Sequence, residues 1–202
     1  MNYVDIHTHR RGETDHIAVV NLAPGEDFCE FRHCSCGIHP WDVKDDWPQQ
    51  MELLRVSCMD KRVVAIGECG LDKLRGGDWK QQVACFEAHV ALARELGKPL
   101  LLHCVKAMDE LLLMCRGVKS VWHGFRGGPN QAVQLLREGL DLSFGEHFNA
   151  DSLLLAYEQR RLWLETDDSA LSIEAVYERA CKVLSISPTD LELPGTITFA
   201  AI

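Results

Sequence analysis

The feature that most constrains the fold is a series of short apolar runs, each of which stops at a glycine, a histidine or an acid. Most of these runs are rich in branched and aromatic residues, which is typical of β-strands. Eight are found, at residues 3–9, 16–22, 33–39, 63–68, 99–104, 120–125, 141–146 and 162–167. Apolar runs of this length predict strands that are buried on both faces, as in a parallel sheet.

Helical patterns separate the later strands, with apolar residues at helical spacing over 49–59, 78–96, 107–116, 130–138, 152–159 and 172–183. Alternating strands and helices predict an α/β fold in which helices cross over between parallel strands. Eight strands favour a closed (β/α) TIM-like barrel, and an open doubly wound sheet is the alternative. Only about six residues separate the first two strands, and a crossover helix needs about ten or more. The barrel is therefore expected to be distorted, with helices missing in its first units.

The chain has 202 residues, which predicts a single domain over residues 1–202. Hydrophobic residues make up 47% and charged residues 25%, as in a soluble globular protein. No apolar run approaches the roughly 20 residues of a membrane helix, and no signal peptide is recognisable. The sequence thus predicts no association with a membrane and indicates no obligate protein partner.

The nine cysteines do not form the pattern of a disulfide scaffold, because their number is odd and no C-x-x-C pair occurs. Several lie inside apolar runs, where a free cysteine behaves as a small hydrophobe. This predicts a reducing, cytoplasmic location. Cys34 and Cys36 could bind a metal or belong to a buried strand, and the strand is favoured because zinc sites prefer wider spacing.

The formal net charge is −9, and no basic run stands out. Tight, non-specific binding of long nucleic acid depends on many Lys and Arg contacts with phosphate, so this class is disfavoured. An enzyme that holds a short stretch of nucleic acid through metal ions stays possible.

The run from Val63 to Ile66 is expected to break at Gly67 and to deliver the carboxylate of Glu68 into a turn that closes at Gly70. A carboxylate at the end of a buried strand is costly unless a cation receives it. Taken alone, Glu68 is explained by a helix cap or a salt bridge. Other strands of this chain, however, also end in histidine or aspartate.

Six candidate ligands lie at the ends of five predicted strands, where a barrel builds its active site. They are His7, His9, Glu68, His103, His123 and Asp167. Each has a separate structural explanation, such as a hydrogen-bonded core histidine or, for Asp167, a helix N-cap. Together they favour a binuclear metal site, since independent structural explanations for all six are improbable.

In this hypothesis Glu68 bridges two cations through its two oxygens. His7 and His9 alternate along one strand and so point to the same side, where they bind the first ion. His103 and His123 bind the second ion. Asp167 binds the first ion and holds the attacking water.

These residues resemble those of the TatD family of metal-dependent deoxyribonucleases, a branch of the amidohydrolase-like barrels. The matching motifs follow one another in the family's order from about residue 3 to residue 183. They are DIHTH (residues 5–9), GIHP (37–40), GECGLD (67–72), PLLLHC (99–104), HGF (123–125) and ETD (165–167). Any one motif is weak, whereas six in series identify the chain as a compact member of this family.

The resemblance implies that His7, His9, Glu68, His103, His123 and Asp167 bind two divalent ions, which could be zinc, magnesium or manganese. In such a site Glu68 and Asp167 are the catalytic carboxylates, and Asp167 orients the water and accepts its proton. His39 and Asp72 belong to matching motifs, which implies either contact with the substrate phosphate or a structural role in the loop.

The chain departs from the family pattern after the fifth strand, where Val105 and Lys106 replace the usual Arg and acid. Lys106 could stand in for that Arg as a point charge, and Arg126 is a second candidate for contact with phosphate. The helix usual between the first two strands and the Pro-rich segment after E-T-D are missing.

The sequence therefore predicts a metal-dependent hydrolase, a phosphodiesterase or deoxyribonuclease acting on DNA ends or short single strands. One alternative is an amidohydrolase-like enzyme that acts on a small amide, lactone or phosphoester. The other is a metal-binding protein that has lost catalysis, which the intact Glu68 and Asp167 argue against.

Overall fold

The computed structural model describes residues 3–12 and 14–198, and its chain divides into two units. The first unit comprises residues 1–20 and 121–196, and the second comprises residues 21–120 and 197–202. Strand β2 (Ile17–Leu22) passes from the first unit into the second. One domain over the whole chain stays a prediction.

The first unit is a parallel sheet built from both ends of the chain. It contains β1 (Val4–Thr8), the start of β2, most of β6 (Ser120–Trp122), β7 (Asp141–Phe144) and β8 (Leu162–Leu164). β1 pairs with β2, β6 with β7 and β7 with β8, all in parallel. A parallel bridge between Thr8 and Asp167 joins the segment after β8 to the end of β1. The last strand thus runs beside the first, as barrel closure requires.

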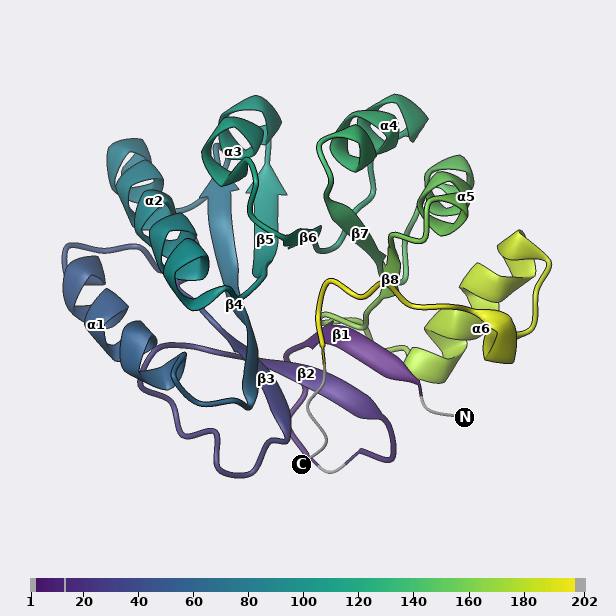
Figure 1. The fold of residues 1–202 in the computed structure, drawn as a ribbon, viewed down its shortest axis with the longest axis horizontal. Coiled ribbons are helices and arrows are strands. Elements are labelled where there is room, and N and C mark those ends of the chain that lie inside the picture. The colour runs from purple at the N-terminus through teal and green to yellow at the C-terminus, as the bar shows by residue number, and fades with distance from the viewer. Residues whose placement is uncertain (1–2, 13, 199–202) are drawn as a thin grey trace. The chain divides into compact units, whose positions relative to one another are not determined.

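Three helices accompany these strands (Figure 1). They are α4 (Pro129–Arg137), α5 (Ala150–Glu158) and α6 (Ile173–Leu184), and a short 3₁₀ helix η1 (Pro188–Asp190) follows. Helix α6 begins where Ser172 accepts a hydrogen bond from the N–H of Ala175, which satisfies a free donor of the first turn. Its buried Tyr177 packs against β1 and donates its hydroxyl to the carbonyl of Val4, 3.1 Å away.

The second unit is also a parallel sheet accompanied by helices, and it is built from the central part of the chain. It contains the end of β2, β3 (His33–Cys36), β4 (Val63–Asp72) and β5 (Leu100–Val105), of which β3, β4 and β5 are paired in parallel. Its helices are α1 (Trp47–Ser57), α2 (Trp79–Leu96) and α3 (Met108–Cys115). Asp78 caps the start of α2, and Gly97 ends it in the left-handed conformation.

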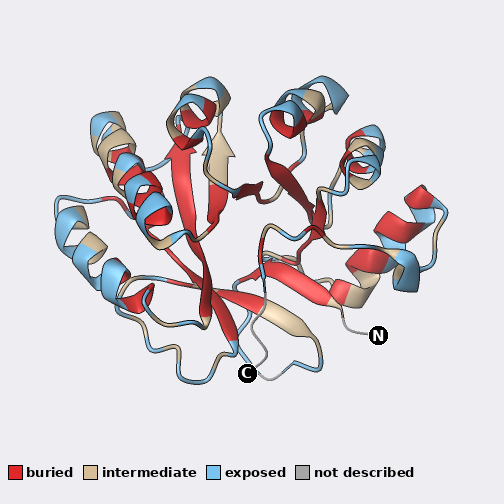
Figure 2. Ribbon diagram, in the orientation of Figure 1, coloured by how far each residue is buried: buried red, intermediate tan, exposed pale blue. Residues whose placement is uncertain are grey.

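Most strand residues are buried, whereas each helix buries one face and exposes the other (Figure 2). This is the burial expected when amphipathic helices cover strands that are apolar on both sides. None of the helices in the described part of the chain combines the length and apolarity that a membrane span requires.

The prediction of a turn at Gly67 is wrong, because β4 continues through Glu68 and ends only at Asp72. The glycines allow close approach to β5 rather than a break. A Cβ at Gly67 would lie 2.3 Å from the carbonyl oxygen of Leu101, and one at Gly70 would lie 1.9 Å from that of His103. Both glycines also have φ near +150°, which other residues rarely adopt. The extension keeps Glu68 and Asp72 on one continuous strand.

The absence of helices between the first strands was predicted from the sequence. No helix is found among the described residues between β1 and β2 or between β2 and β3. Cys34 and Cys36 lie buried in β3, as the strand interpretation predicts, and burial raises the pKa of the Cys34 thiol to about 12. A thiol that stays protonated is a poor metal ligand.

Candidate metal centre

In the first unit, His7, His9 and Asp167 form a cluster at the end of β1. Nε2 of each imidazole lies 3.6 Å from Oδ1 of Asp167, and the two ring centroids are 5.0 Å apart. His7 is buried and His9 is exposed, while the Asp167 side chain is about one third exposed (32%). The cluster is therefore anchored in the core on one side and open to solvent on the other.

Asp167 lies three residues beyond the end of β8 and is held by backbone contacts with β1. Its N–H donates to the carbonyl of His7 at 2.9 Å, and its own carbonyl accepts from the N–H of His9. Its φ is +50°, in the left-handed region that few residues other than glycine occupy. The pairing with β1 thus directs the carboxylate toward the two histidines, and the role of helix N-cap belongs to Ser172 instead.

His123 follows β6, and its imidazole lies against that of His7, with 4.4 Å between ring centroids. Its Nδ1 is 3.4 Å from Oε1 of Glu165, which also accepts the N–H of Gly124 at 2.7 Å. Glu165 is fully buried, and its second oxygen, Oε2, has no hydrogen-bond partner among the described residues. A carboxylate bonded to one ring nitrogen of a histidine fixes the orientation of the ring, as is common for metal-binding histidines.

In the second unit, Glu68 of β4 faces two imidazoles. Its Oε1 lies 2.8 Å from Nδ1 of His103 and 3.1 Å from Nε2 of His39, and those two nitrogens are 3.2 Å apart. The carboxylate is almost completely buried. The N–H of Glu68 donates to Oδ1 of Asn21 at 2.7 Å, which fixes the backbone under the carboxylate. Glu68, His103 and His39 form what we call the β4–β5 cluster.

The protonation of His39 follows from its neighbour Trp41. The N–H of Trp41 donates to Nδ1 of His39 at 3.1 Å, so this nitrogen carries no proton. In the neutral ring the proton is then on Nε2, which faces Glu68. A protonated nitrogen cannot bind a metal, and His39 is in this arrangement an N–H donor rather than a ligand.

Asp72 ends β4 and accepts several hydrogen bonds. Its Oδ2 accepts Nε1 of Trp41 at 2.7 Å and is 3.4 Å from Nε2 of His103, while Oδ1 accepts the N–H groups of Leu74 and Arg75. Burial acts to raise the pKa of Asp72, but these donors together hold it below its ordinary value. Asp72 therefore stays ionised and orients the His103 ring, so that Nδ1 of that ring faces Glu68.

The two cations predicted to contact phosphate lie in loops at strand ends. Lys106 directly follows β5, is exposed and has φ of +57°. Arg126 is exposed in the segment between β6 and α4. Each belongs to the same unit as one of the clusters, Arg126 to the first and Lys106 to the second.

The structure adds three residues that the sequence did not single out, namely Asp5, Asn21 and Glu165. Asp5 and Glu165 lie inside the DIHTH and ETD motifs, so an acid two residues before a candidate ligand was the available signal. Each accepts a backbone N–H at or directly beside a candidate ligand, namely that of Thr166 for Asp5, Glu68 for Asn21 and Gly124 for Glu165. Asn21, the penultimate residue of β2, carried no comparable signal.

The donor sets in the two units suit a divalent ion. In the first unit, His7, His9 and Asp167 offer ligand atoms that all lie within 4.8 Å of one another. His39, Glu68 and His103 do the same in the second, where His39 differs from the other two in carrying its proton on Nε2 in the neutral form. Imidazole nitrogen combined with carboxylate oxygen is a donor set that zinc, manganese and iron accept.

The chain is an α/β protein of the (β/α) barrel class, because parallel strands alternate with helices and the last strand lies beside the first. Histidines and carboxylates at the ends of these strands are its candidate metal ligands. The chain belongs to the TatD related DNase family, whose model matches residues 5–182. The family predicted from the motifs is thereby confirmed.

Relatives with similar sequences carry names of the same kind. The chain is 34% identical over 146 residues to the 3'-5' ssDNA/RNA exonuclease TatD of Klebsiella pneumoniae (strain 342), covering 66% of this chain and 56% of that protein. It is 34% identical over 150 residues to the uncharacterized metal-dependent hydrolase YcfH of Escherichia coli (strain K12), covering 68% and 56%. The chain thus spans little more than half the length of these curated relatives.

Solved structures show the same fold. The TatD homologue YJJV of Escherichia coli has a TM-score of 0.72 at 20% identity, over 90% of each chain. A TatD family hydrolase of Entamoeba histolytica has a TM-score of 0.71 at 16% identity, over 94% of each chain. The predicted fold class, a (β/α) barrel, is thereby confirmed.

Proposed function

We propose that this chain is a metal-dependent phosphodiesterase that hydrolyses single-stranded nucleic acid, acting on DNA ends or short strands. The observation that carries the proposal is the pair of histidine–carboxylate clusters at strand ends in a chain of the TatD related DNase family. The name of the Klebsiella relative, a 3'-5' ssDNA/RNA exonuclease, supports the substrate class.

The six residues named from the sequence are the proposed ligands of two divalent ions, namely His7, His9, Glu68, His103, His123 and Asp167. Zinc, magnesium and manganese are the candidates, and the number of nitrogen donors favours zinc or manganese over magnesium. When bound, such ions lower the pKa of a coordinated water and polarise a phosphoryl oxygen.

Asp167 is the proposed general base. Its carboxylate is partly exposed while its backbone is held by β1, so it combines access to solvent with a fixed position. In the reaction, Asp167 orients the attacking water and accepts its proton. The oxygen of the water then forms a bond to phosphorus as the bond from phosphorus to the leaving oxygen breaks.

His39 and Asp72 have different proposed roles at the β4–β5 cluster. In its neutral form His39 carries a proton on Nε2, 3.1 Å from Oε1 of Glu68, and once Glu68 binds a metal ion this N–H is the proposed donor to a phosphate oxygen. Asp72, whose Oδ2 lies 3.4 Å from Nε2 of His103, has the proposed role of orienting that ring. The sequence left both a substrate contact and a structural role open for each residue, and the proposal assigns the substrate contact to His39 and the structural role to Asp72.

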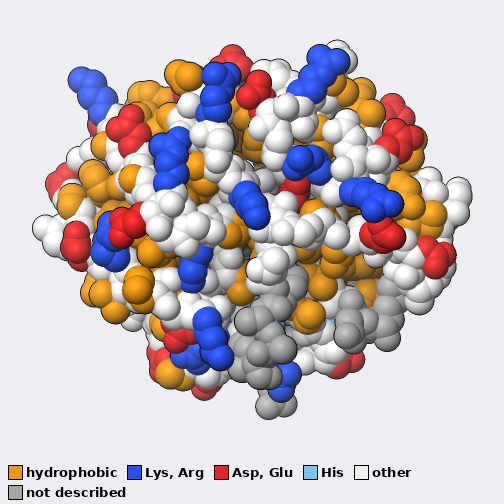
Figure 3. Space-filling model, in the orientation of Figure 1, with side chains coloured by type: hydrophobic (Ala, Val, Ile, Leu, Met, Phe, Trp, Pro, Cys, Tyr) orange, Lys and Arg blue, Asp and Glu red, His pale blue; other side chains and the backbone are white. Residues whose placement is uncertain are grey.

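Lys106 and Arg126 each supply positive charge for contact with phosphates of the substrate. Because the chain carries a net charge of −9, isolated cations are expected to matter more than a general basic surface. On the face drawn in Figure 3, Lys and Arg side chains stand apart from one another, with Asp and Glu among them. This supports contact with a few phosphates rather than with a long strand.

A reducing compartment such as the cytoplasm is the proposed location. All nine cysteines are free, and most of them are buried. Buried free thiols behave as small hydrophobes and need no oxidising environment.

The decisive experiment compares substrates and one substitution. After removal of metal by a chelator, addition of zinc, magnesium or manganese should restore cleavage of a single-stranded oligonucleotide but not of a panel of small amides and lactones. Asp167→Asn should lower kcat by about 10²- to 10⁴-fold, as expected for loss of a general base. Hydrolysis of amides or lactones in place of oligonucleotides would favour the alternative function, an amidohydrolase-like enzyme. Metal binding without any turnover would identify the other alternative, a protein that has lost catalysis.

A further inference from the structure

An aromatic side chain stands beside the β4–β5 cluster with part of its surface in solvent. Trp41 is 40% exposed, and its ring lies edge-on to His39 and His103, at centroid distances of 4.7 and 5.7 Å. Its Nε1 donates to Oδ2 of Asp72 at 2.7 Å. The indole is thus held in a fixed position next to the candidate metal ligands although it is not buried in the core.

The guanidinium of Arg75 lies on this indole, with its central carbon 3.7 Å from the ring centroid. At this distance the cation lies against the face of the aromatic ring. Arg75 is exposed, and its N–H is bound by Asp72 at 3.0 Å, so the backbone beneath the side chain is fixed. Trp41 and Arg75 together form a stacked pair, which we call the Trp41–Arg75 pair.

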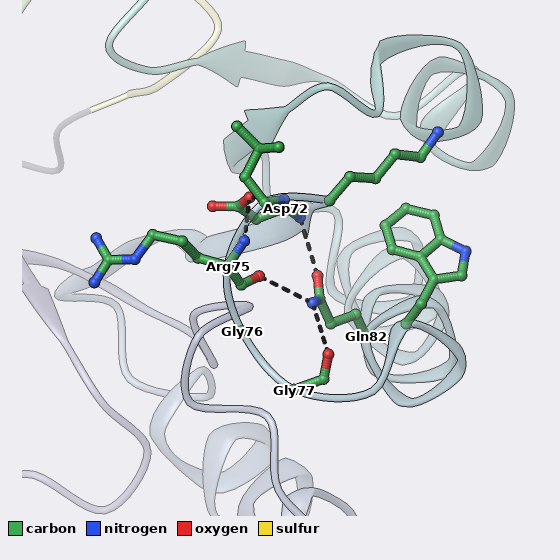
Figure 4. A pocket seen from close by; sticks show the side chains of 8 residues that line it. Asp72, Arg75, Gly76, Gly77 and Gln82 are labelled. Carbon is green, nitrogen blue, oxygen red and sulfur yellow. Dashed lines mark hydrogen bonds between the residues drawn. The ribbon is translucent and has the colours of Figure 1, made fainter.

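The loop that carries Arg75 is held by one buried side chain (Figure 4). Gln82 of α2 accepts the N–H of Asp72 at 3.0 Å and donates to the carbonyls of Arg75 and Gly77, both at 3.3 Å. The side chain of Arg75 extends away from Gln82 in this view. The loop also curls around a cavity of about 460 Å³.

The same loop is packed against the segment that carries Trp41. A Cβ at Gly76 would lie 2.6 Å from the carbonyl oxygen of Pro40, so only glycine permits this approach. The two parts of the pair are therefore brought together by backbone packing as well as by their own contact. A site built in this way needs little reorganisation when a ligand binds.

We propose that the Trp41–Arg75 pair is a stacking platform for a nucleobase of the substrate, next to the phosphate bound at the β4–β5 cluster. The inference rests on the proposed function and names the part of the nucleotide that the enzyme would recognise. Indole rings and guanidinium planes both stack on bases, and such stacking is tolerant of sequence because every base has a flat face. A small amide or lactone without an aromatic group would gain nothing from such a surface.

The test measures binding, so that it does not depend on turnover. In the Asp167→Asn background, fluorescence anisotropy gives the Kd of a labelled single strand and of the same strand with an abasic residue at successive positions from its 3′ end. At one position near the end, loss of the base should raise Kd by about 5- to 100-fold. Trp41→Ala should abolish this ratio between abasic and intact strands, and Arg75→Ala should reduce it.

Two further variants separate stacking from the hydrogen bond to Asp72. Trp41→Phe keeps an aromatic face but loses the N–H, so it should retain much of the ratio. Trp79→Ala removes another tryptophan close to the same loop and should leave the ratio unchanged. Three results would overturn the platform. The ratio of Kd between abasic and intact strands could be the same in Trp41→Ala as in the Asp167→Asn parent, it could be one in the parent, or the parent could bind no strand at all. If the ratio is as expected but the wild-type enzyme cleaves no oligonucleotide, the proposed activity fails and the platform stands.

Discussion

Thr166 donates two hydrogen bonds to the carboxylate of Asp5, one from its N–H to Oδ1 at 2.9 Å and one from its hydroxyl to Oδ2 at 2.6 Å. Both side chains are buried. Thr166 directly precedes Asp167, whose left-handed backbone needs support from its surroundings. The pair joins β1 to the segment after β8 and thereby fixes the position of the proposed general base.

Thr166→Val should weaken both stability and catalysis, because it leaves Oδ2 of Asp5 buried without this donor. The free energy of unfolding should fall by about 1–3 kcal/mol. We expect kcat on an oligonucleotide to fall with little change in KM, since Asp167 would be mispositioned rather than removed. Urea denaturation and steady-state kinetics measure the two effects. Thr166→Ser keeps the hydroxyl and is the matched control, and equal values for the Val and Ser variants would show that the pair does not support Asp167.

Glu165→Gln should weaken metal binding without unfolding the protein. The amide oxygen of Gln can still accept the N–H of Gly124, but the charge beside Nδ1 of His123 is lost. Removal of such a partner typically lowers metal affinity by about 10- to 100-fold. Titration against a chelating dye measures this change. Glu158→Gln, on the exposed end of α5, should bind metal as the wild type does. Wild-type affinity in Glu165→Gln would show that the buried carboxylate has only a structural role.

Much of the fold could be predicted because the chain marks its strands clearly. Apolar runs such as residues 162–167 are bounded by polar residues, and helices begin and end at caps such as Asp78 and Gly97. The course of β4 could not be predicted in full. From the sequence, Gly67 and Gly70 are interpreted as turn residues. In the structure they allow the backbone of β4 to approach β5, a strand that is distant in the chain.

The candidate site, too, could be predicted only in part, because some of its contacts depend on neighbours distant in the chain. The ends of strands indicate which histidines and acids gather, because the direction of parallel strands brings those ends to one side. The proton on His39 could not be predicted, because it is determined by the backbone N–H of Trp41, whose direction the sequence does not reveal. The contact between Glu165 and His123 could not be predicted either, because forty-two positions separate the two residues in the chain.

Lys106→Ala and Arg126→Ala should raise KM for a single-stranded oligonucleotide with a smaller change in kcat. Each removes one cation proposed to contact a phosphate. The dependence of log KM on log salt should become shallower by about 0.7 for each lost contact with a single strand. Steady-state kinetics between low and moderate salt provides the measurement. Lys80→Ala, on the exposed start of α2, is the control for a change of charge alone. If all three variants share the salt dependence of the wild type, neither loop contacts the phosphates.

His89 should make the protein less stable as the pH falls from about 6.5 to 4. It is fully buried in α2, where Nδ1 donates to the carbonyl of Cys85 at 2.8 Å and Nε2 accepts the N–H of Ile38 at 3.0 Å. Burial lowers the pKa of His89 to about 4, although the bond to Cys85 acts to raise it. Between these pH values the unfolded chain binds a proton that the folded protein does not, so unfolding is favoured.

The loss should amount to roughly 3 kcal/mol across this pH range, with little further contribution from His89 above pH 6.5 or below pH 4. His89→Gln removes the titrating group, so the difference in unfolding free energy between wild type and variant should shrink as the pH falls. Urea denaturation of both proteins in the presence of a chelator measures this difference free of metal effects. A difference that stays constant with pH would contradict the assignment. Protonation of Nε2 of His89 also removes the acceptor for the N–H of Ile38. Because Ile38 directly precedes His39, the segment that positions His39, the proposed donor to phosphate, should be released as well.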